Sequence, residues 1–192
     1  MIPQEITTQL AALYAEMEAA YDDTARAVGL SCRECPDNCC DSFFYHHTYL
    51  EWAYLWEGVN GLPAERREEI VRRAEAYEEE SGKCLARGER PQLMCPVNEG
   101  GLCVLYPHRL MICRLHGVPS ALTRPDGQAL RFPGCFRCQE IAGSQEAAPL
   151  DRTPLLQRLA RLEMEWLGPR RHVLPKMKMT IAGMLVEGEP GL

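Results

Sequence analysis

The chain lacks the features that mark several large classes of proteins. No run of apolar residues approaches the roughly 18 that a membrane-spanning helix needs. The first ten residues, MIPQEITTQL, contain no basic segment followed by an apolar one, so we expect no secretory signal and a cytoplasmic location. Sustained blocks of lysine and arginine are also missing and the formal net charge is −6, so neither a membrane nor nucleic acid is an expected partner.

Motifs of common catalytic chemistry are missing as well. There is no glycine-rich phosphate loop, no radical-SAM C-x3-C-x2-C and no HExxH, and no general base or nucleophile stands at a recognised spacing. The acid-rich stretch EAYEEES, residues 75–81, is interpreted as a solvated helical face rather than a site for a hard cation. The sequence therefore favours no reaction, and an enzyme is not the leading hypothesis.

Cysteine is abundant instead, with ten in 192 residues. A chain of this length buries enough apolar surface to fold without disulfides, and in a reducing cytosol clustered cysteines are more often ligands or redox groups. The tenth, Cys84, lies in a predicted helix and is expected to be ordinary packing. The other nine are predicted metal ligands: Cys32, Cys35, Cys39, Cys40, Cys95, Cys103, Cys113, Cys135 and Cys138.

Spacing supports a metal site but leaves its form open. Two residues between cysteines, as in C32-x2-C35 and C135-x2-C138, let both sulfurs reach one ion from a single turn. The sulfurs of adjacent Cys39 and Cys40 should point apart in extended backbone, so at most one should bind a given tetrahedral ion. Nine thiols permit two four-cysteine sites, one bridged multinuclear site, or one iron–sulfur cluster with accessory thiols.

Zinc and iron are not separated by these patterns. Cys-Pro pairs, such as Cys95-Pro96, occur in ferredoxin-type cluster ligands and in zinc knuckles alike. Neutral imidazoles could complete a site, so His46, His47 and His116 are retained as less favoured ligands. The expected cofactor is therefore zinc or iron, including a [4Fe-4S]-type cluster, and no protein partner is indicated.

Apolar periodicity predicts a helical frame around an irregular centre. Three- and four-residue steps predict long helices over 3–28 and 64–86, and Thr48 with Glu51 predicts the start of a helix that runs to about 58. Further helices are expected from Thr153 and over 176–186, a short strand over 42–47, and a hairpin around Pro125–Gly127. The fold class is mainly α with an irregular, cysteine-rich metal-binding centre and a small β-hairpin.

Three regions follow from this pattern. Residues 1–30 are expected to form an N-terminal helix that packs on the core, and residues 31–143 a cysteine-cluster metal-binding domain with a helical insertion at about 48–86. Residues 149–192 are expected to form C-terminal helices of the same globular unit.

The order of these motifs resembles a known family. C-x2-C-x3-C-C, then C-P, then G-x-C-x2-Y-x2-R-x3-C-R and a final cysteine, over residues 32–138, resemble the CxxCxxCC or YkgJ-like cysteine-cluster proteins. The chain departs from the commoner pattern in three ways: it has three residues rather than two before the vicinal pair, Leu110 where proline is usual, and Cys138 as an addition.

The resemblance implies a cytoplasmic, bacterial-type protein that chelates zinc or iron through its cysteines. Tyr106, Arg109 and Arg114 fall on the family's Tyr and Arg positions. Next to a thiolate centre these residues would contact the sulfurs without binding the metal, since a guanidinium offsets negative charge and donates N–H···S contacts.

Three hypotheses about function remain. The leading one is that the metal mainly holds the irregular segment together, because binding free energy becomes folding free energy. The second is an iron–sulfur enzyme or redox protein, by analogy with the related cysteine cluster of flagellin lysine N-methylases. The third is metal storage or delivery.

Overall fold

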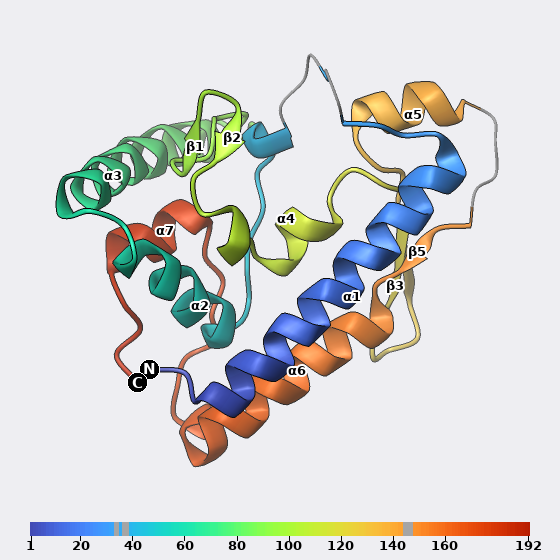
Figure 1. Cartoon of the computed structure of the whole chain (residues 1–192). Coiled ribbons are helices and arrows are strands. Elements are labelled where there is room, and N and C mark those ends of the chain that lie inside the picture. Colours follow the sequence, from blue (N-terminus) through green and yellow to red (C-terminus); the bar gives the residue numbers. More distant parts are fainter. Residues whose placement is uncertain (33–34, 36–38, 144–147) are drawn as a thin grey trace. The chain divides into compact units, whose positions relative to one another are not determined.

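The computed structural model describes residues 1–32, 35, 39–143 and 148–192, and these form two compact units (Figure 1). The first unit comprises residues 1–2, 40–110 and 169–192, and the second comprises residues 3–39 and 111–168. The predicted fold class, mainly α with a small β region, is confirmed.

Three helices build the core of the first unit: α2 (Tyr49–Asn60), α3 (Ala64–Ala86) and α7 (Ile181–Glu187). Helix α2 begins where predicted, because the Thr48 side chain accepts a hydrogen bond from the Glu51 N–H. Helix α7 packs on α3, and Leu50, Ile70 and Leu185 are almost fully buried. These helices give the first unit an apolar core.

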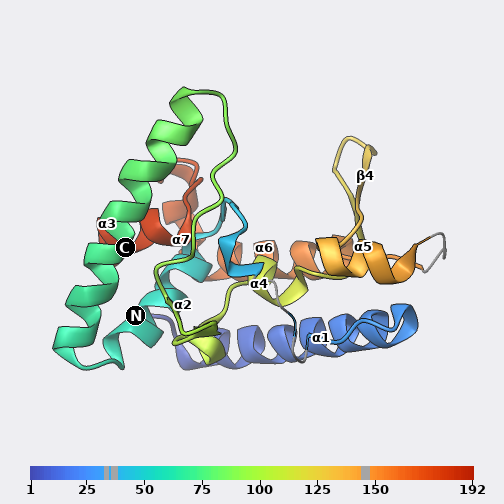
Figure 2. The same cartoon turned by 90° about the horizontal axis from the view of Figure 1, so that it is seen from above.

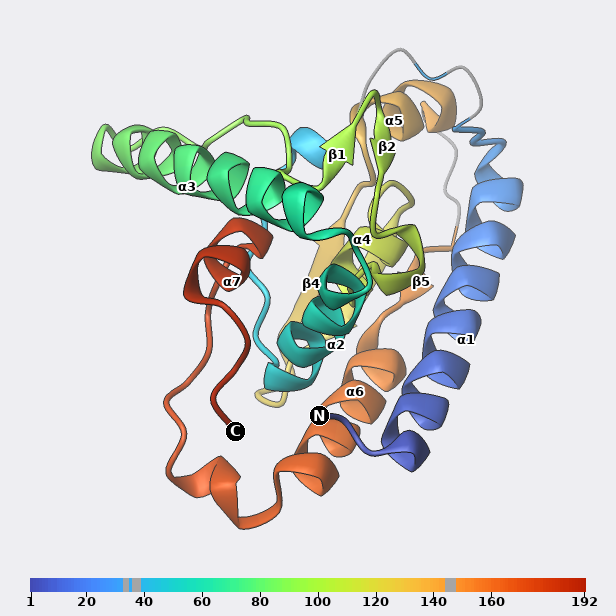
Figure 3. The same ribbon diagram turned by 60° about the vertical axis from the view of Figure 1, so that its left-hand side comes forward.

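The remainder of the first unit is short elements and loops. The 3-10 helices η1 (Cys39–Asp41), η2 (Tyr106–His108) and η3 (Gly168–His172) lie within it or at its ends. Strands β1 (Asn98–Glu99) and β2 (Leu102–Cys103) form an antiparallel hairpin, which Figure 3 shows beside α3. The hairpin, the turn that precedes it and η1 carry several of the predicted ligands.

The second unit is built on two long helices, α1 (Gln4–Val28) and α6 (Thr153–Leu167), which pack side by side (Figure 2). Two short helices, α4 (Met111–Leu115) and α5 (Phe136–Ala142), also pack on α1. Strands β3 (Ser120–Thr123), β4 (Ala129–Phe132) and β5 (Leu150–Asp151) form a small sheet in the order β4-β3-β5. The β3–β4 hairpin extends away from the helices of this unit in Figure 2.

Most predicted elements are present, and two differ. The helices expected at 3–28 and 64–86 occur within a residue of those limits, and Gly29 ends the first with a φ of 72°. The strand expected over 42–47 is not formed as a strand. That segment makes one isolated antiparallel bridge, between His46 and Met179. The last helix begins at Ile181 rather than at 176, because Thr180 provides the N-cap directly before Ile181.

Other sequence-based expectations are not tested by the fold. The predicted domain ranges 1–30, 31–143 and 149–192 stay a prediction, since the two units are sets of non-contiguous segments. Within the described part of the chain, none of the helices combines the length and apolar character that crossing a bilayer requires.

Candidate metal-binding thiols

Three cysteines of the first unit come together from segments that are distant in the sequence. We call Cys40, Cys95 and Cys103 the Cys95 group. The Cys95 N–H donates to the Cys40 carbonyl at 3.0 Å, so η1 lies directly against the start of the hairpin segment. The Asn98 N–H donates to the Cys95 carbonyl at 2.9 Å, and Asn98 pairs with Cys103 across the hairpin. Backbone pairing therefore fixes all three positions.

The surroundings of the Cys95 thiol disfavour its ionised form. Its pKa is raised to about 12, chiefly by burial and also by the Cys40 and Cys103 thiolates. The Val97 N–H acts in the opposite direction because it donates a hydrogen bond to the sulfur, and the Arg73 guanidinium also lowers this pKa. An N–H two residues after the cysteine that points at the sulfur is the arrangement expected of a metal-binding knuckle.

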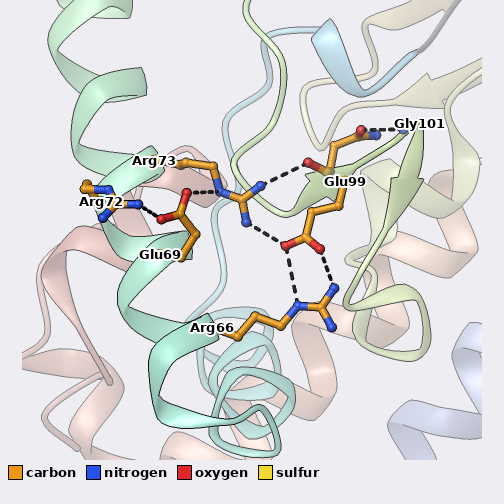
Figure 4. A network of polar contacts seen from close by, with 7 residues as sticks. Arg66, Glu69, Arg72, Arg73, Glu99 and Gly101 are labelled. Atoms are coloured by element: carbon orange, nitrogen blue, oxygen red, sulfur yellow. Dashed lines mark hydrogen bonds and ion pairs between the residues drawn. The ribbon is translucent and has the colours of Figure 1, made fainter.

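Helix α3 anchors the hairpin that carries this group. The Glu99 carboxylate of β1 forms ion pairs with Arg66 and Arg73, and the Arg73 contact measures 2.8 Å (Figure 4). Arg73 also donates to the Asn98 carbonyl at 3.3 Å. Tyr77 lies one turn further along α3, where burial and the nearby Cys95 thiolate raise its pKa to about 12. Arg73 and Tyr77 of α3 thus lie near Cys95, and Glu99 holds the hairpin to the same helix.

Four cysteines of the second unit form two C-x2-C turns. We call Cys32, Cys35, Cys135 and Cys138 the Cys135 group. In the first turn the Cys35 N–H donates to the Cys32 carbonyl at 3.3 Å. In the second, Cys135 is the N-cap of α5, and its sulfur accepts a hydrogen bond from the Cys138 N–H at 3.4 Å. The Tyr21 hydroxyl of α1 lies 3.5 Å from the Cys32 sulfur.

The turn that carries Cys135 and Cys138 is closely packed. Cys138 is fully buried, and burial raises the pKa of its thiol, with further contributions from the thiolates of Cys135 and Cys32. The Cys135 N–H donates to the Gly117 carbonyl at 3.0 Å. Gly134 has a φ of 92°, and a Cβ on it would lie 2.7 Å from the Gly117 carbonyl oxygen and 3.1 Å from the Cys138 sulfur. Only glycine fits there.

The remaining cysteines have different positions. Cys113 is half-buried in α4 of the second unit. Cys84 lies in α3, as predicted, with the Arg87 guanidinium 3.5 Å from its sulfur. Cys39 lies in η1, but its side chain is outside the described part of the structure, so the predicted opposite directions of the Cys39 and Cys40 sulfurs stay a prediction.

The three residues expected to contact the sulfurs make other contacts. The Arg109 guanidinium lies 3.7 Å from the centre of the Tyr106 ring, and Tyr106 itself is exposed. Arg114 is buried, forms an ion pair with Glu18 and lies 4.3 Å from the Tyr14 ring centre. Arg114 thereby joins α4 to α1. Thiolate contacts of all three residues stay a prediction.

The histidines lie in different surroundings. His46 is buried, and in the described structure its Nδ1 has no hydrogen-bond partner. Burial, followed by the charge of His47, lowers the pKa of His46 to about 3, so its imidazole is neutral. His47 Nδ1 is 3.3 Å from the Met177 carbonyl oxygen, and His116 is half-buried directly after α4.

Several residues around the thiols are not singled out by the sequence. From the pattern of apolar residues in the sequence, Tyr21 is expected only to pack on the inner side of its helix. Arg73 is expected only to belong to a charged helix. Helical periodicity shows which side of α3 carries Arg73 and Tyr77, but not that Cys95 lies against it. The one local signal is the glycine next to the second C-x2-C turn, Gly134.

The sulfurs are near one another but are not arranged as ligands. Among the described residues, no three His, Cys, Asp or Glu side chains are placed so that they could hold one metal ion. The described cysteines are thiols rather than disulfides. Binding at either group would therefore require a rearrangement of cysteine side chains, such as rotation about χ1 to another staggered rotamer.

No family model, curated protein or solved structure matches this chain. The resemblance to the CxxCxxCC family accordingly stays a prediction, carried by the motif order alone.

Proposed function

We propose that this chain is a cytoplasmic protein of the CxxCxxCC type that binds zinc or iron through cysteine thiolates, and that the metal mainly stabilises its irregular segments. The supporting observation is that backbone contacts bring together Cys40, Cys95 and Cys103 from distant segments of the first unit. N–H groups are also directed at the Cys95 and Cys135 sulfurs. Soft thiolate donors of this kind suit zinc and iron–sulfur chemistry.

The surroundings of the thiols fit this proposal. A cation offsets the negative charge that otherwise opposes ionisation of neighbouring buried thiols. In the Cys95 group the backbone brings the three cysteines together, and in the Cys135 group each C-x2-C turn holds its own two. The segments that carry them have little regular structure of their own: β1 and β2 have two residues each and α5 has seven. Such segments gain most from a metal cross-link.

A thermal melt of the metal-free protein tests the structural role. The metal is removed with a chelator under reducing conditions, and unfolding is followed by circular dichroism. At a free ion concentration about 100 times Kd, each site contributes about 2.7 kcal/mol, so the metal-free protein should melt several degrees lower. Re-addition of zinc should restore the melt. An unchanged melt for a verifiably metal-free chain would contradict the proposal.

An absorption spectrum separates the proposal from its iron–sulfur alternative. Zinc bound to thiolates is colourless, whereas an iron–sulfur cluster gives a brown protein with labile sulfide. Zinc without colour supports the structural role, and iron with sulfide supports the redox or enzymatic alternative. Rapid transfer of the metal to a chelating acceptor would instead support storage or delivery.

A further inference from the structure

The cysteines of the two thiol groups divide between the two units without overlap. Cys40, Cys95 and Cys103 belong to the first unit. Cys32, Cys35, Cys135 and Cys138 belong to the second. The division falls between Cys39 and Cys40, which are adjacent in the chain, since residue 39 ends one segment of the second unit and residue 40 begins a segment of the first.

We propose that the chain has two thiolate metal sites that load independently, one formed by the Cys95 group and one by the Cys135 group. This inference rests on the proposed function and specifies which thiols act together. In the first unit it is carried by the backbone hydrogen bonds and strand pairing that join the three members of the Cys95 group. In the second unit it is carried by the Tyr21 hydroxyl, which lies 3.5 Å from the Cys32 sulfur and also lies against Gly117. The Gly117 carbonyl in turn accepts the Cys135 N–H, so the two C-x2-C turns lie on either side of Tyr21 and Gly117.

The two sites differ in the ligands that they offer. The Cys135 group supplies four thiols on two C-x2-C turns, which is the complement of a closed tetrahedral site with four cysteine ligands. The Tyr21 hydroxyl and the Cys138 N–H are directed at sulfurs of this group and can donate to the thiolates. This site has the composition of a structural zinc site.

The Cys95 group supplies three thiols from the described part of the chain. It lies beside Arg73, and α3 holds its hairpin through Glu99. A cation beside the thiolates lowers the net negative charge of the loaded site. Three thiolates bind a tetrahedral ion tightly and leave one coordination position for a further ligand.

Matched serine variants of the full chain test the division. Cys95→Ser leaves two thiols in one group, and Cys135→Ser combined with Cys138→Ser leaves two thiols in the other. Cys84→Ser is the control because Cys84 belongs to neither. Each protein is stripped of metal, reconstituted with Zn²⁺ alone and measured by native mass spectrometry. We expect two ions in the unmodified chain and in Cys84→Ser, one in each variant altered in one group, and none in the variant altered in both groups.

Results that would overturn the two-site inference can be distinguished from a result that would overturn the proposed metal-binding function. Loss of all zinc from either variant altered in one group, or two ions retained in both, would refute two independent sites while leaving metal binding intact. Absence of zinc from the unmodified chain, together with failure to take up iron when iron is supplied instead, would refute the proposed function itself.

A second measurement covers variants that do not fold. The unmodified, metal-free chain is titrated with Zn²⁺ and its thiols are alkylated, and the modified cysteines are identified by mass spectrometry. At two equivalents, both groups should be protected and Cys84 should remain reactive. Protection of both groups by the first equivalent alone would overturn the two-site inference.

Discussion

The buried His46 makes stability depend on pH in a way that can be calculated. Its imidazole has a pKa of about 3 in the folded chain, against 6.5 for the exposed group, and burial is the main cause. Below pH 6.5 the unfolded chain therefore binds a proton that the folded chain does not. Stability from this residue is complete above pH 6.5 and is lost progressively as the pH falls toward 3.

The size of the effect follows from the difference in pKa. Each pH unit between the two values costs about 1.4 kcal/mol, so at pH 5 the loss relative to pH 8 is about 2 kcal/mol. For a chain of this size that corresponds to a decrease in Tm of roughly 4–8 °C. Other groups also titrate over this range, so the effect of His46 is obtained from a comparison of variants.

The assay is urea unfolding of the reduced protein at pH 8 and pH 5. The His46→Gln variant keeps an amide near the Nε2 position, but glutamine does not take up a proton in this range. Between pH 8 and pH 5 its free energy of unfolding should therefore fall about 2 kcal/mol less than that of the unmodified chain. His172→Gln, at an exposed histidine, should behave as the unmodified chain. Equal pH dependence in His46→Gln and the unmodified chain would refute the argument.

Three further substitutions test individual contacts. Glu99→Gln should cost about 1 kcal/mol, because both of its ion pairs are partly solvated, and should weaken Zn²⁺ binding in a competition titration; unchanged affinity would contradict the anchoring role of Glu99. Gly134→Ala should destabilise by more than the roughly 1–2 kcal/mol expected of Gly127→Ala, which has a similar φ but open space around its Cβ; equal denaturation midpoints would show that the close contact does not matter. Arg114→Met should cost about 1–2 kcal/mol in thermal unfolding by removing the ion pair with Glu18 and the contact with the Tyr14 ring, and an unchanged Tm would contradict that role.

Local signals are sufficient to predict the long elements. The Thr48 cap, the Gly29 terminator and apolar steps of three and four residues locate helices, because each depends on residues within one or two turns. The turn at Pro125–Gly127 locates the β3–β4 hairpin for the same reason. Short helices such as α5 are not predicted, since seven residues carry too little periodicity to be recognised.

The ligand-rich segments can be recognised from spacing, but their grouping cannot. Spacing shows that Cys135 and Cys138 share a turn, yet no local rule shows that Cys95 lies against Cys40 or that Cys32 belongs with Cys138. The first relation depends on long-range backbone pairing, and the second on the position of Tyr21 between Cys32 and Gly117. The same limitation explains why the sequence does not indicate the ion pair of Arg114 with Glu18 of α1.

The most direct test of the account is elemental analysis, with an absorption spectrum, of the full chain purified without oxygen. The account predicts zinc or iron in a fixed ratio to protein, lost when the cysteines of both thiol groups are replaced by serine and retained in Cys84→Ser. A folded chain that contains neither metal and takes up neither after reduction would contradict it.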